Sequence, residues 1–310
     1  MINGIINVYK EKGYTSHDVV AKLRGILKQK KIGHTGTLDP EAEGVLPVCL
    51  GKATRVCDML TEKDKVYQAV LLLGQKTDTQ DTTGTVLERA EVTCTKEQVQ
   101  QAVQLFVGTY AQIPPMYSAL KVNGKKLCDL ARAGIEVERK PREVTIFSIE
   151  IKEIDLPRVK MTVHCSKGTY IRTLCQDIGE KLGCGGCMES LLRTKVAQFT
   201  LEQSFKLSEI EHCVQKLRQQ TEIELTTEML EGIVKKTDTV FEEYPQIFAK
   251  TGFEKMLYNG NAMQPEWLEG WKESMQEEKI RLYDQQKHFI GVYQYNSKYQ
   301  DIRPIKIFME

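Results

Sequence analysis

The residues with the clearest capacity for chemistry lie in the segment 33–51, GHTGTLDPEAEGVLPVCLG. It brings four glycines, two prolines, His34 and Asp39 into nineteen residues. Pro40 fixes the backbone after Asp39 and disfavours helical angles at Asp39 itself. The pattern predicts a stiff loop that presents one carboxylate beside an apolar run. An Asp-Pro turn in a plain connecting loop has the same signature, so spacing alone leaves both interpretations open.

Two other kinds of site receive less support from the sequence. The segment 33–51 lacks the Gly-Lys-Ser/Thr ending of a phosphate-binding P-loop. Cys184 and Cys187 have the spacing of half a zinc site, but no second pair with similar spacing is present. We therefore expect structural cysteines and no metal.

Composition and charge narrow the class of protein. The net charge of +1 argues against a protein that coats nucleic acid nonspecifically. Residues 121–143 nevertheless hold seven Lys/Arg against four Asp/Glu, whereas residues 201–243 hold five against ten. This predicts a local basic surface, although ordinary surface charge could produce the same difference. Nine cysteines without a disulfide framework, no secretory signal and no run of ~20 apolar residues indicate a cytoplasmic protein without a membrane span.

The elements that must position these residues can be read from hydrophobic periodicity. It predicts helices over 16–29, 96–107 and 170–182, with Ser16 as the cap of the first, and strands over 66–73, 144–154 and 159–165. Helices and strands alternate without a regular repeat, which favours an α+β fold. A composition shift near 237–245 precedes short strand patterns. We therefore predict a large domain over 1–240 and a small all-β module over 246–310.

The segment 33–51 resembles the signature of the TruB family, the bacterial tRNA pseudouridine-55 synthases. Five further blocks agree in order: 65–67, 73–84 (LGQKTDTQDTTG), 114–144 (PPMYSALKVNGKKLCDLARAGIEVERKPREV), 165–179 (CSKGTYIRTLCQDIG) and 191–194 (LLRT). The chain departs from the family pattern at Glu43, where Thr is common, and at Leu192, where Arg is common. Neither departure touches Asp39.

This resemblance implies a fold, a reaction and a substrate. The fold would be a mixed, largely antiparallel sheet with a PUA-type RNA-binding module at the C-terminus. The protein would be an isomerase that breaks the C1′–N1 bond of the T-loop uridine in tRNA, turns the base and joins C5 to C1′. The reaction involves no net redox change, so no cofactor is expected. The partner would be the T-stem-loop of tRNA, and nothing in the sequence demands more than a monomer.

The resemblance also implies roles for particular residues. Asp39 would be the catalytic carboxylate, and Arg172 would pair with it. Tyr67 would stack on the target base and serve as a proton acceptor at C5, while Leu191 would close the pocket. His34 would occupy the space left by the flipped base. Read alone, the last four are equally compatible with ordinary packing or surface roles.

The segment 114–144 is expected to be a basic insertion that grips RNA and becomes ordered on binding it. Its expected phosphate contacts are Lys121, Lys125, Lys126, Arg132 and Lys140.

Three alternative functions stay open at this point. One is an RNA-binding or tRNA-folding factor that uses the same surface. Another is a glycosidase-like hydrolase, which would need a second carboxylate ~5–9 Å from Asp39. Asp78 and Asp81 are the nearest candidates by motif. The third is the catalytic subunit of a guide-RNA particle, against which the absence of long basic tails argues.

Overall fold

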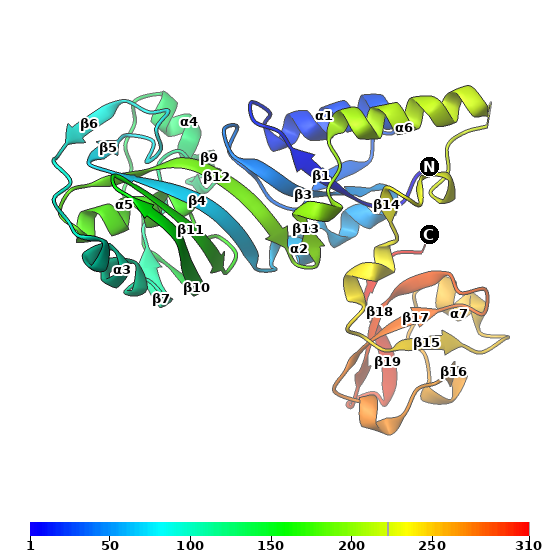
Figure 1. The fold of residues 1–310 in the computed structure, drawn as a ribbon. Coiled ribbons are helices and arrows are strands. Elements are labelled where there is room, and N and C mark those ends of the chain that lie inside the picture. The colour runs from blue at the N-terminus through cyan, green and yellow to red at the C-terminus, as the bar shows by residue number, and fades with distance from the viewer. Residues whose placement is uncertain (222, 310) are drawn as a thin grey trace.

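The computed structural model describes residues 1–221 and 223–309, which form a large domain built on one sheet and a smaller sheet-rich module (Figure 1). The large sheet contains ten strands. Eight follow one path from edge to edge: β14 (Val234–Lys235), β1 (Gly4–Lys10), β3 (Glu43–Leu50), β12 (Gly186–Val196), β4 (Lys65–Leu73), β11 (Arg158–Cys165), β10 (Arg142–Asp155) and β7 (Gly108–Gln112). The short strands β2 (Ile32–His34) and β13 (Phe199–Thr200) pair with β3 and β12.

The large sheet consists of two halves that meet at one narrow contact. β3 and β12 run parallel and pair only at Leu192↔Glu43 and Arg193↔Gly44, whereas the other strand pairs are antiparallel. A Cβ at position 44 would lie 2.2 Å from the Arg193 carbonyl oxygen, and Gly44 has a φ of +107°, so this contact requires glycine. The α+β prediction with a largely antiparallel sheet is confirmed.

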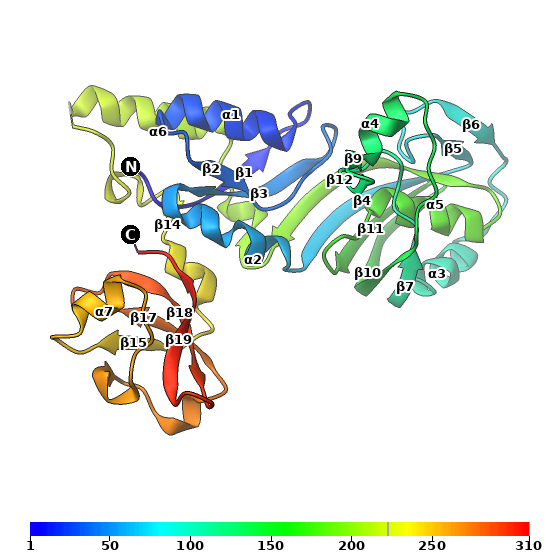
Figure 2. The ribbon, with the colours of Figure 1, turned by 180° about the vertical axis from the view of Figure 1, so that it is seen from behind.

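Helices cover the two halves separately. α1 (Ser16–Leu27) and α6 (Leu207–Gln220) lie side by side over β1 and β3, as both ribbon views show (Figures 1 and 2). α3 (Lys96–Gln104) and α5 (Ile171–Lys181) pack against the other half. In α1, Val19, Leu23 and Leu27 form the buried stripe that the sequence predicts.

The predicted cap of α1 is wrong by one residue. Thr15 is the N-cap: its hydroxyl accepts from the Asp18 N–H at 3.0 Å, and the Asp18 carboxylate accepts from the Thr15 N–H at 2.8 Å. This reciprocal pair is a capping box, which satisfies two backbone donors at once. Ser16 is therefore free to bond elsewhere, and it bonds to Leu38.

The predicted strands and helices of the other half lie close to their expected positions. β4, β10, β11 and α5 each begin or end within two residues of the prediction, while α3 ends at Gln104, three residues early. Alternate residues of β11, from Val159 to Cys165, are fully buried, as the alternation predicts. In this half, β5 (Gln75–Thr77) and β6 (Val86–Arg89) form a hairpin. The short helix α2 (Cys57–Thr61) precedes β4.

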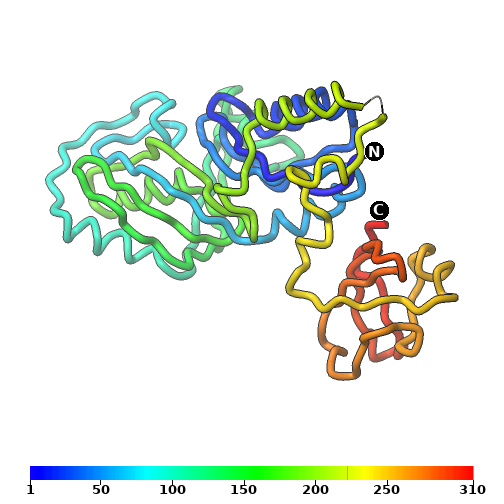
Figure 3. Tube along the Cα trace, turned by 45° about the vertical axis from the view of Figure 1, so that its right-hand side comes forward, coloured from blue at the N-terminus to red at the C-terminus, as the bar shows by residue number. Residues whose placement is uncertain are grey.

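The small module contains a five-stranded sheet in the order β16 (Leu268–Glu269), β15 (Gln246–Ala249), β17 (Lys279–Tyr283), β18 (Phe289–Asn296) and β19 (Asp301–Ile307). A short helix, α7 (Glu254–Tyr258), accompanies the strands. Figure 3 follows the chain from the large domain into this module.

The module packs on the large domain through a shared apolar cluster. Phe289 and Phe308 of the module join Ile5, Val45 and Phe241 in one buried core. Arg55 Nη1 also donates to the Ile307 carbonyl at 2.8 Å. Since β3 contributes Val45 to this cluster and Leu46 to the cluster beneath α1, the same strand supports both packing layers.

The segment between β7 and β10 spans residues 113–141, and we refer to it below as the insertion. It contains the hairpin β8 (Lys121–Val122) and β9 (Lys125–Lys126), followed by α4 (Leu127–Arg132). Among the described residues, no helix is long and apolar enough to cross a bilayer.

Candidate active site

Asp39 lies in the loop between β2 and β3, and the peptide groups on both sides of it are anchored. The Leu38 N–H donates to Ser16 Oγ at 3.0 Å. The Pro40 carbonyl accepts from the Gly13 N–H at 2.9 Å and from Lys10 Nζ at 3.0 Å. The loop is therefore held by α1 and by the end of β1, which fixes the backbone that carries the carboxylate.

Lys10 is a buried cation that the sequence analysis did not single out. Its Nζ donates to three backbone carbonyls, those of Glu11, Tyr14 and Pro40, at 2.6 to 3.1 Å. Burial lowers the pKa of Lys10 to about 8, opposed by the nearby Glu43 and Asp39 carboxylates. Since its partners are backbone carbonyls, which any residue type supplies, no side-chain pattern in the sequence marks it.

Arg172 and Asp39 form a two-point ion pair. Arg172 Nε lies 2.9 Å from Asp39 Oδ2, and Nη2 donates to Oδ1 at 3.3 Å. The Arg172 side chain is 6% exposed, whereas that of Asp39 is 38% exposed. The buried guanidinium thus contacts one side of the carboxylate, and the other side is exposed to solvent. This is the arrangement expected of a reactive acid.

The electrostatics of Asp39 reflect two opposing influences. Burial raises the pKa of Asp39 above its ordinary value, and the positive charge of Arg172 opposes that rise. Arg172 is fixed in turn by the Thr79 carbonyl at 3.1 Å and the Tyr117 carbonyl at 2.8 Å. It therefore holds one orientation toward the carboxylate.

Asp81 lies on the opposite side of the same guanidinium, with Oδ2 3.8 Å from Arg172 Nη1. Its Oδ1 accepts from the hydroxyls of Thr79 and Thr83 and from the Thr83 N–H. Oδ1 is held by three hydrogen bonds and Oδ2 faces the guanidinium, so Asp81 is a second counter-charge for Arg172. A hydrolase would need a second carboxylate free to transfer protons, and Asp81 does not meet this requirement.

Tyr67 and Leu191 lie on the same face of the sheet, since Tyr67 is opposite Arg193 and Leu191 is opposite Ala69 in the pairing of β4 with β12. Tyr67 lies in β4 and is 8% exposed, and the half-buried Leu191 packs against the same core cluster from β12. Burial raises the pKa of Tyr67, while the positive charge of Arg193 opposes the rise. The structure therefore places Tyr67 and Leu191 on one face of the sheet, at the core cluster that also includes Leu38 of the loop that carries Asp39.

Arg193 is a second buried arginine that the sequence analysis did not single out. It is 1% exposed and directly opposite Tyr67 in the pairing of β12 with β4. Its Nε donates to the Val45 carbonyl at 2.7 Å, but Nη2 has no hydrogen-bond partner within the described residues. The only sequence signal for it is its place in the block 191–194.

His34 ends β2, five residues before Asp39. Its Nδ1 lies 2.9 Å from the Gly36 carbonyl, and its ring meets that of His17 edge-on at 5.2 Å. Burial lowers the pKa of His34, which favours the neutral imidazole. A neutral ring at the rim of the site suits stacking or wedging better than ion pairing.

The two departures from the family pattern are neighbours in space. Glu43 and Leu192 are Cα partners in the narrow parallel contact between β3 and β12. Glu43 Oε1 accepts from the Tyr9 hydroxyl at 3.2 Å. The departures therefore change one local contact of the sheet and leave the Asp39–Arg172 pair intact.

The expected phosphate contacts of the insertion are all exposed. Lys121 and Lys126 are Cα partners across the β8–β9 hairpin, and Lys125 lies beside them. Arg132 has an ion-pair partner, Asp129, at 3.8 Å. Like charges opposite one another destabilise a hairpin, so this arrangement favours binding of an anion.

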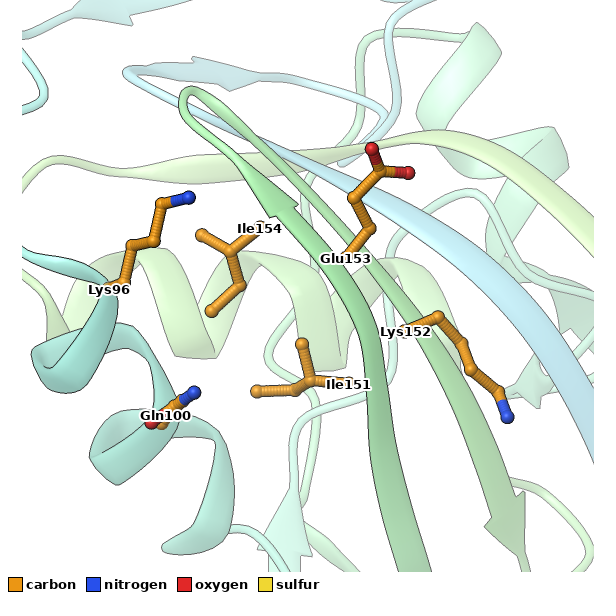
Figure 4. A pocket seen from close by; sticks show the side chains of 6 residues that line it. All are labelled: Lys96, Gln100, Ile151, Lys152, Glu153 and Ile154. Carbon is orange, nitrogen blue, oxygen red and sulfur yellow. The ribbon is translucent and has the colours of Figure 1, made fainter.

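Other features of the structure contribute no chemistry to this site. Cys184 and Cys187 are buried free thiols, and no group of three or more His, Cys, Asp or Glu within the described residues could hold a metal ion. A surface hollow lies between α3 and β10, where Ile151 and Ile154 point toward the helix (Figure 4). It contains none of the predicted site residues.

Comparison with known proteins places this fold among the pseudouridine synthases. The structure matches the crystal structure of a Cbf5-Nop10-Gar1 complex with a TM-score of 0.72 and 26% identity, covering 99% of this chain and 85% of that one.

Family comparison is more specific. Residues 24–171 match the N-terminal domain of the TruB family pseudouridylate synthases, and residues 172–242 match the tRNA pseudouridylate synthase B C-terminal domain. The tRNA pseudouridine synthase B of Lachnoclostridium phytofermentans is 54% identical over 99% of this chain and all of that protein. That of Alkaliphilus oremlandii is 46% identical over 86% of this chain and 85% of that protein. The chain belongs to the TruB family.

Proposed function

We propose that this protein converts the T-loop uridine of tRNA to pseudouridine, with Asp39 as the reacting carboxylate. The observation that carries this proposal is the Asp39–Arg172 pair, in which a buried guanidinium fixes a carboxylate with one open side. An ionised carboxylate beside C1′ stabilises the positive charge that develops on the sugar as the C1′–N1 bond breaks. Arg172 favours the ionised form that this step requires.

In this proposal the target base lies against the side chains of Tyr67 and Leu191. A uridine inside a folded RNA loop reaches them only after it leaves its stack. Tyr67 then faces the base and accepts the proton from C5 after the new bond forms. His34, at the rim of the same loop, fills the space that the base has vacated.

In this proposal the insertion supplies much of the affinity for tRNA. Lys121, Lys125 and Lys126 contact backbone phosphates of the T-stem, and Arg132 and Lys140 extend the contact. The exposed, like-charged hairpin supports this role. We propose that one chain suffices for activity without a cofactor, since Asp39, Tyr67 and Arg172 come from the same chain, and that the protein acts in the cytoplasm as a monomer.

The identity of this chain with proteins named tRNA pseudouridine synthase B supports a stand-alone enzyme over the subunit of a guide-RNA particle. Identity reaches 54% with the former and is 26% with the Cbf5 chain.

The test is release of tritium from C5-labelled uridine in unmodified tRNA, without added metal or cofactor, by the native protein and Asp39→Asn. Release by the native protein alone supports the proposal. If neither protein releases tritium and both bind tRNA tightly, the second candidate function, an RNA-binding or tRNA-folding factor, takes its place. The exposed basic hairpin is the observation that favours this second candidate.

A further inference from the structure

Gln112, the last residue of β7, is 1% exposed and uses its whole amide group. Its Nε2 donates to the Tyr170 carbonyl at 3.0 Å and to the Tyr110 hydroxyl at 2.5 Å. Its Oε1 accepts from the Tyr170 N–H at 2.8 Å. One side chain thus grips both backbone groups of a single residue in another element.

Tyr170 is the N-cap of α5, two residues before Arg172. Within the described residues, the Tyr170 side chain makes no capping hydrogen bond. Helix starts are normally defined by such a bond, and without it the first turn has more freedom to shift. Gln112 provides the missing constraint from the neighbouring strand, so it fixes the point at which α5 begins.

We propose that Gln112 is a positioning residue, which holds Arg172 in register with Asp39 by fixing the backbone of Tyr170. This inference rests on the proposed function, because it assigns Gln112 to the same site. Gln112 acts through α5 and does not contact Asp39 or substrate.

A second contact ties the same segment to Arg172. The insertion begins immediately after Gln112, and the carbonyl of its Tyr117 accepts from Arg172 Nη2 at 2.8 Å. That nitrogen also donates to Asp39 Oδ1. Residues 112–117, where the insertion begins, therefore constrain Arg172 at two points. Gln112 fixes the backbone at the start of its helix, and the Tyr117 carbonyl holds its guanidinium.

The expected consequence is a loss of rate without a loss of binding. A displacement of about 1 Å in a catalytic group lowers the rate by about a hundredfold. A displaced Arg172 also lowers the pKa of Asp39 less effectively, so the acid limb of the rate profile moves to higher pH. A residue that only stabilises the fold does not move that limb.

The experiment compares the native protein with Gln112→Leu, which removes all three hydrogen bonds at similar volume, and with Gln112→Asn, which keeps an amide that is shorter by one methylene. Thr109→Val is the matched control. Thr109 lies in the same strand, is exposed and bonds to Thr145 at 3.4 Å. Single-turnover release of C5 tritium at saturating tRNA is followed from acidic to neutral pH, with the tRNA Kd and the Tm measured in parallel.

Gln112→Leu is expected to lower the rate by roughly ten- to a hundredfold and to shift the acid limb upward, with the Kd within about threefold of native. Thr109→Val should match the native protein. If Gln112→Leu fails to fold, the result for Gln112→Asn is used to test the inference, and a smaller loss with the same direction of shift is expected. A native rate, or a lower rate with an unmoved acid limb, overturns the inference.

A double-mutant cycle provides the second criterion. If Gln112 acts through Arg172, Gln112→Leu should lower the rate far less in an Arg172→Lys background than in the native one. Equal losses in both backgrounds overturn the inference. Failure of the native protein itself to release tritium is a separate result, which rejects the proposed function.

Discussion

The loop that carries Asp39 and the insertion over residues 113–141 differ in almost every physical respect. In the loop, the peptides flanking Asp39 are tied to Ser16, Gly13 and Lys10, and the carboxylate rests on a buried guanidinium. The insertion places its lysines in solvent, and its hairpin sets Lys121 against Lys126. The first region holds one carboxylate in a fixed orientation, and the second presents positive charge that attracts a polyanion.

This difference teaches that rate and affinity reside in separate parts of the chain. Catalysis depends on groups that are fixed before the substrate arrives. Attraction to phosphates depends on charge and tolerates freedom in the side chains. Substitutions in the loop should therefore change kcat, and substitutions in the insertion should change KM and its dependence on salt.

After Asp39→Asn, which is treated last, Arg172→Gln is expected to have the largest effect among the substitutions that sharpen this contrast. Removing the charge and the two-point contact should lower the single-turnover rate by roughly 10³-fold, while tRNA binding changes little. The control is Arg158→Gln, which removes an exposed ion pair with Glu189 at 2.8 Å. A large loss of tRNA binding by Arg172→Gln would break the proposed separation.

The pH dependence of the rate should be shaped by Asp39. Burial raises its pKa above 3.8, and the reaction needs the ionised form, so the rate should fall as the pH decreases through that raised value. Loss of the Arg172 charge removes an opposing influence, so the acid limb of Arg172→Gln should lie at higher pH than that of the native protein. If the acid limb does not move, the charge of Arg172 does not influence the pKa of Asp39, which would contradict this account.

Replacing Lys121, Lys125 and Lys126 together with alanine should weaken tRNA binding and leave the rate at saturating tRNA near native. For every phosphate that the variant no longer neutralises, the slope of log K against log salt should become shallower by about 0.7 to 0.9. Lys216→Ala, an exposed lysine of α6, is the control for charge alone. A fall in the saturated rate would show that the insertion also participates in the chemistry.

Ser16→Ala should have the smallest effect, because it leaves one buried backbone N–H of the loop, that of Leu38, without its partner. We expect a loss of about 1 kcal/mol in the free energy of unfolding and a few-fold lower rate. Denaturant titration and tritium release measure the two effects. Thr15→Ala, which weakens the cap of α1 without touching the loop, should lower stability and leave the rate unchanged.

Much of the fold could be predicted because local signals agree with the global structure. β11 shows clean alternation, α1 has a regular apolar stripe, and α5 ends close to Gly183, which has a φ of +76°. β12 could not be recognised in this way. Its pairing with β4 shifts register twice, near Met188 and near Arg193, and each shift interrupts the alternation on which the prediction depends.

The site could be predicted only in part. Asp39 has a local signature in the glycines and prolines around it, whereas its partner Arg172 lies 133 residues away and was indicated only by the resemblance. Gln112 is fixed by a backbone group 58 residues away, and the contact of Lys10 with the Pro40 carbonyl spans 30 residues, so no local residue pattern points to either contact. By motif Asp81 is a candidate second catalytic acid, whereas in the structure it lies against Arg172, and this position depends on how its loop folds.

The central claim is that the loop with Asp39 sets the rate and the insertion sets the affinity for tRNA. The most direct test measures C5 tritium release at saturating tRNA, together with the tRNA Kd, for three proteins. These are the native protein, Asp39→Asn and the triple lysine variant. We predict that Asp39→Asn binds like the native protein and releases tritium at least about 10⁴-fold more slowly, while the lysine variant binds weakly and reacts at the native rate. Near-native release by Asp39→Asn would contradict the account.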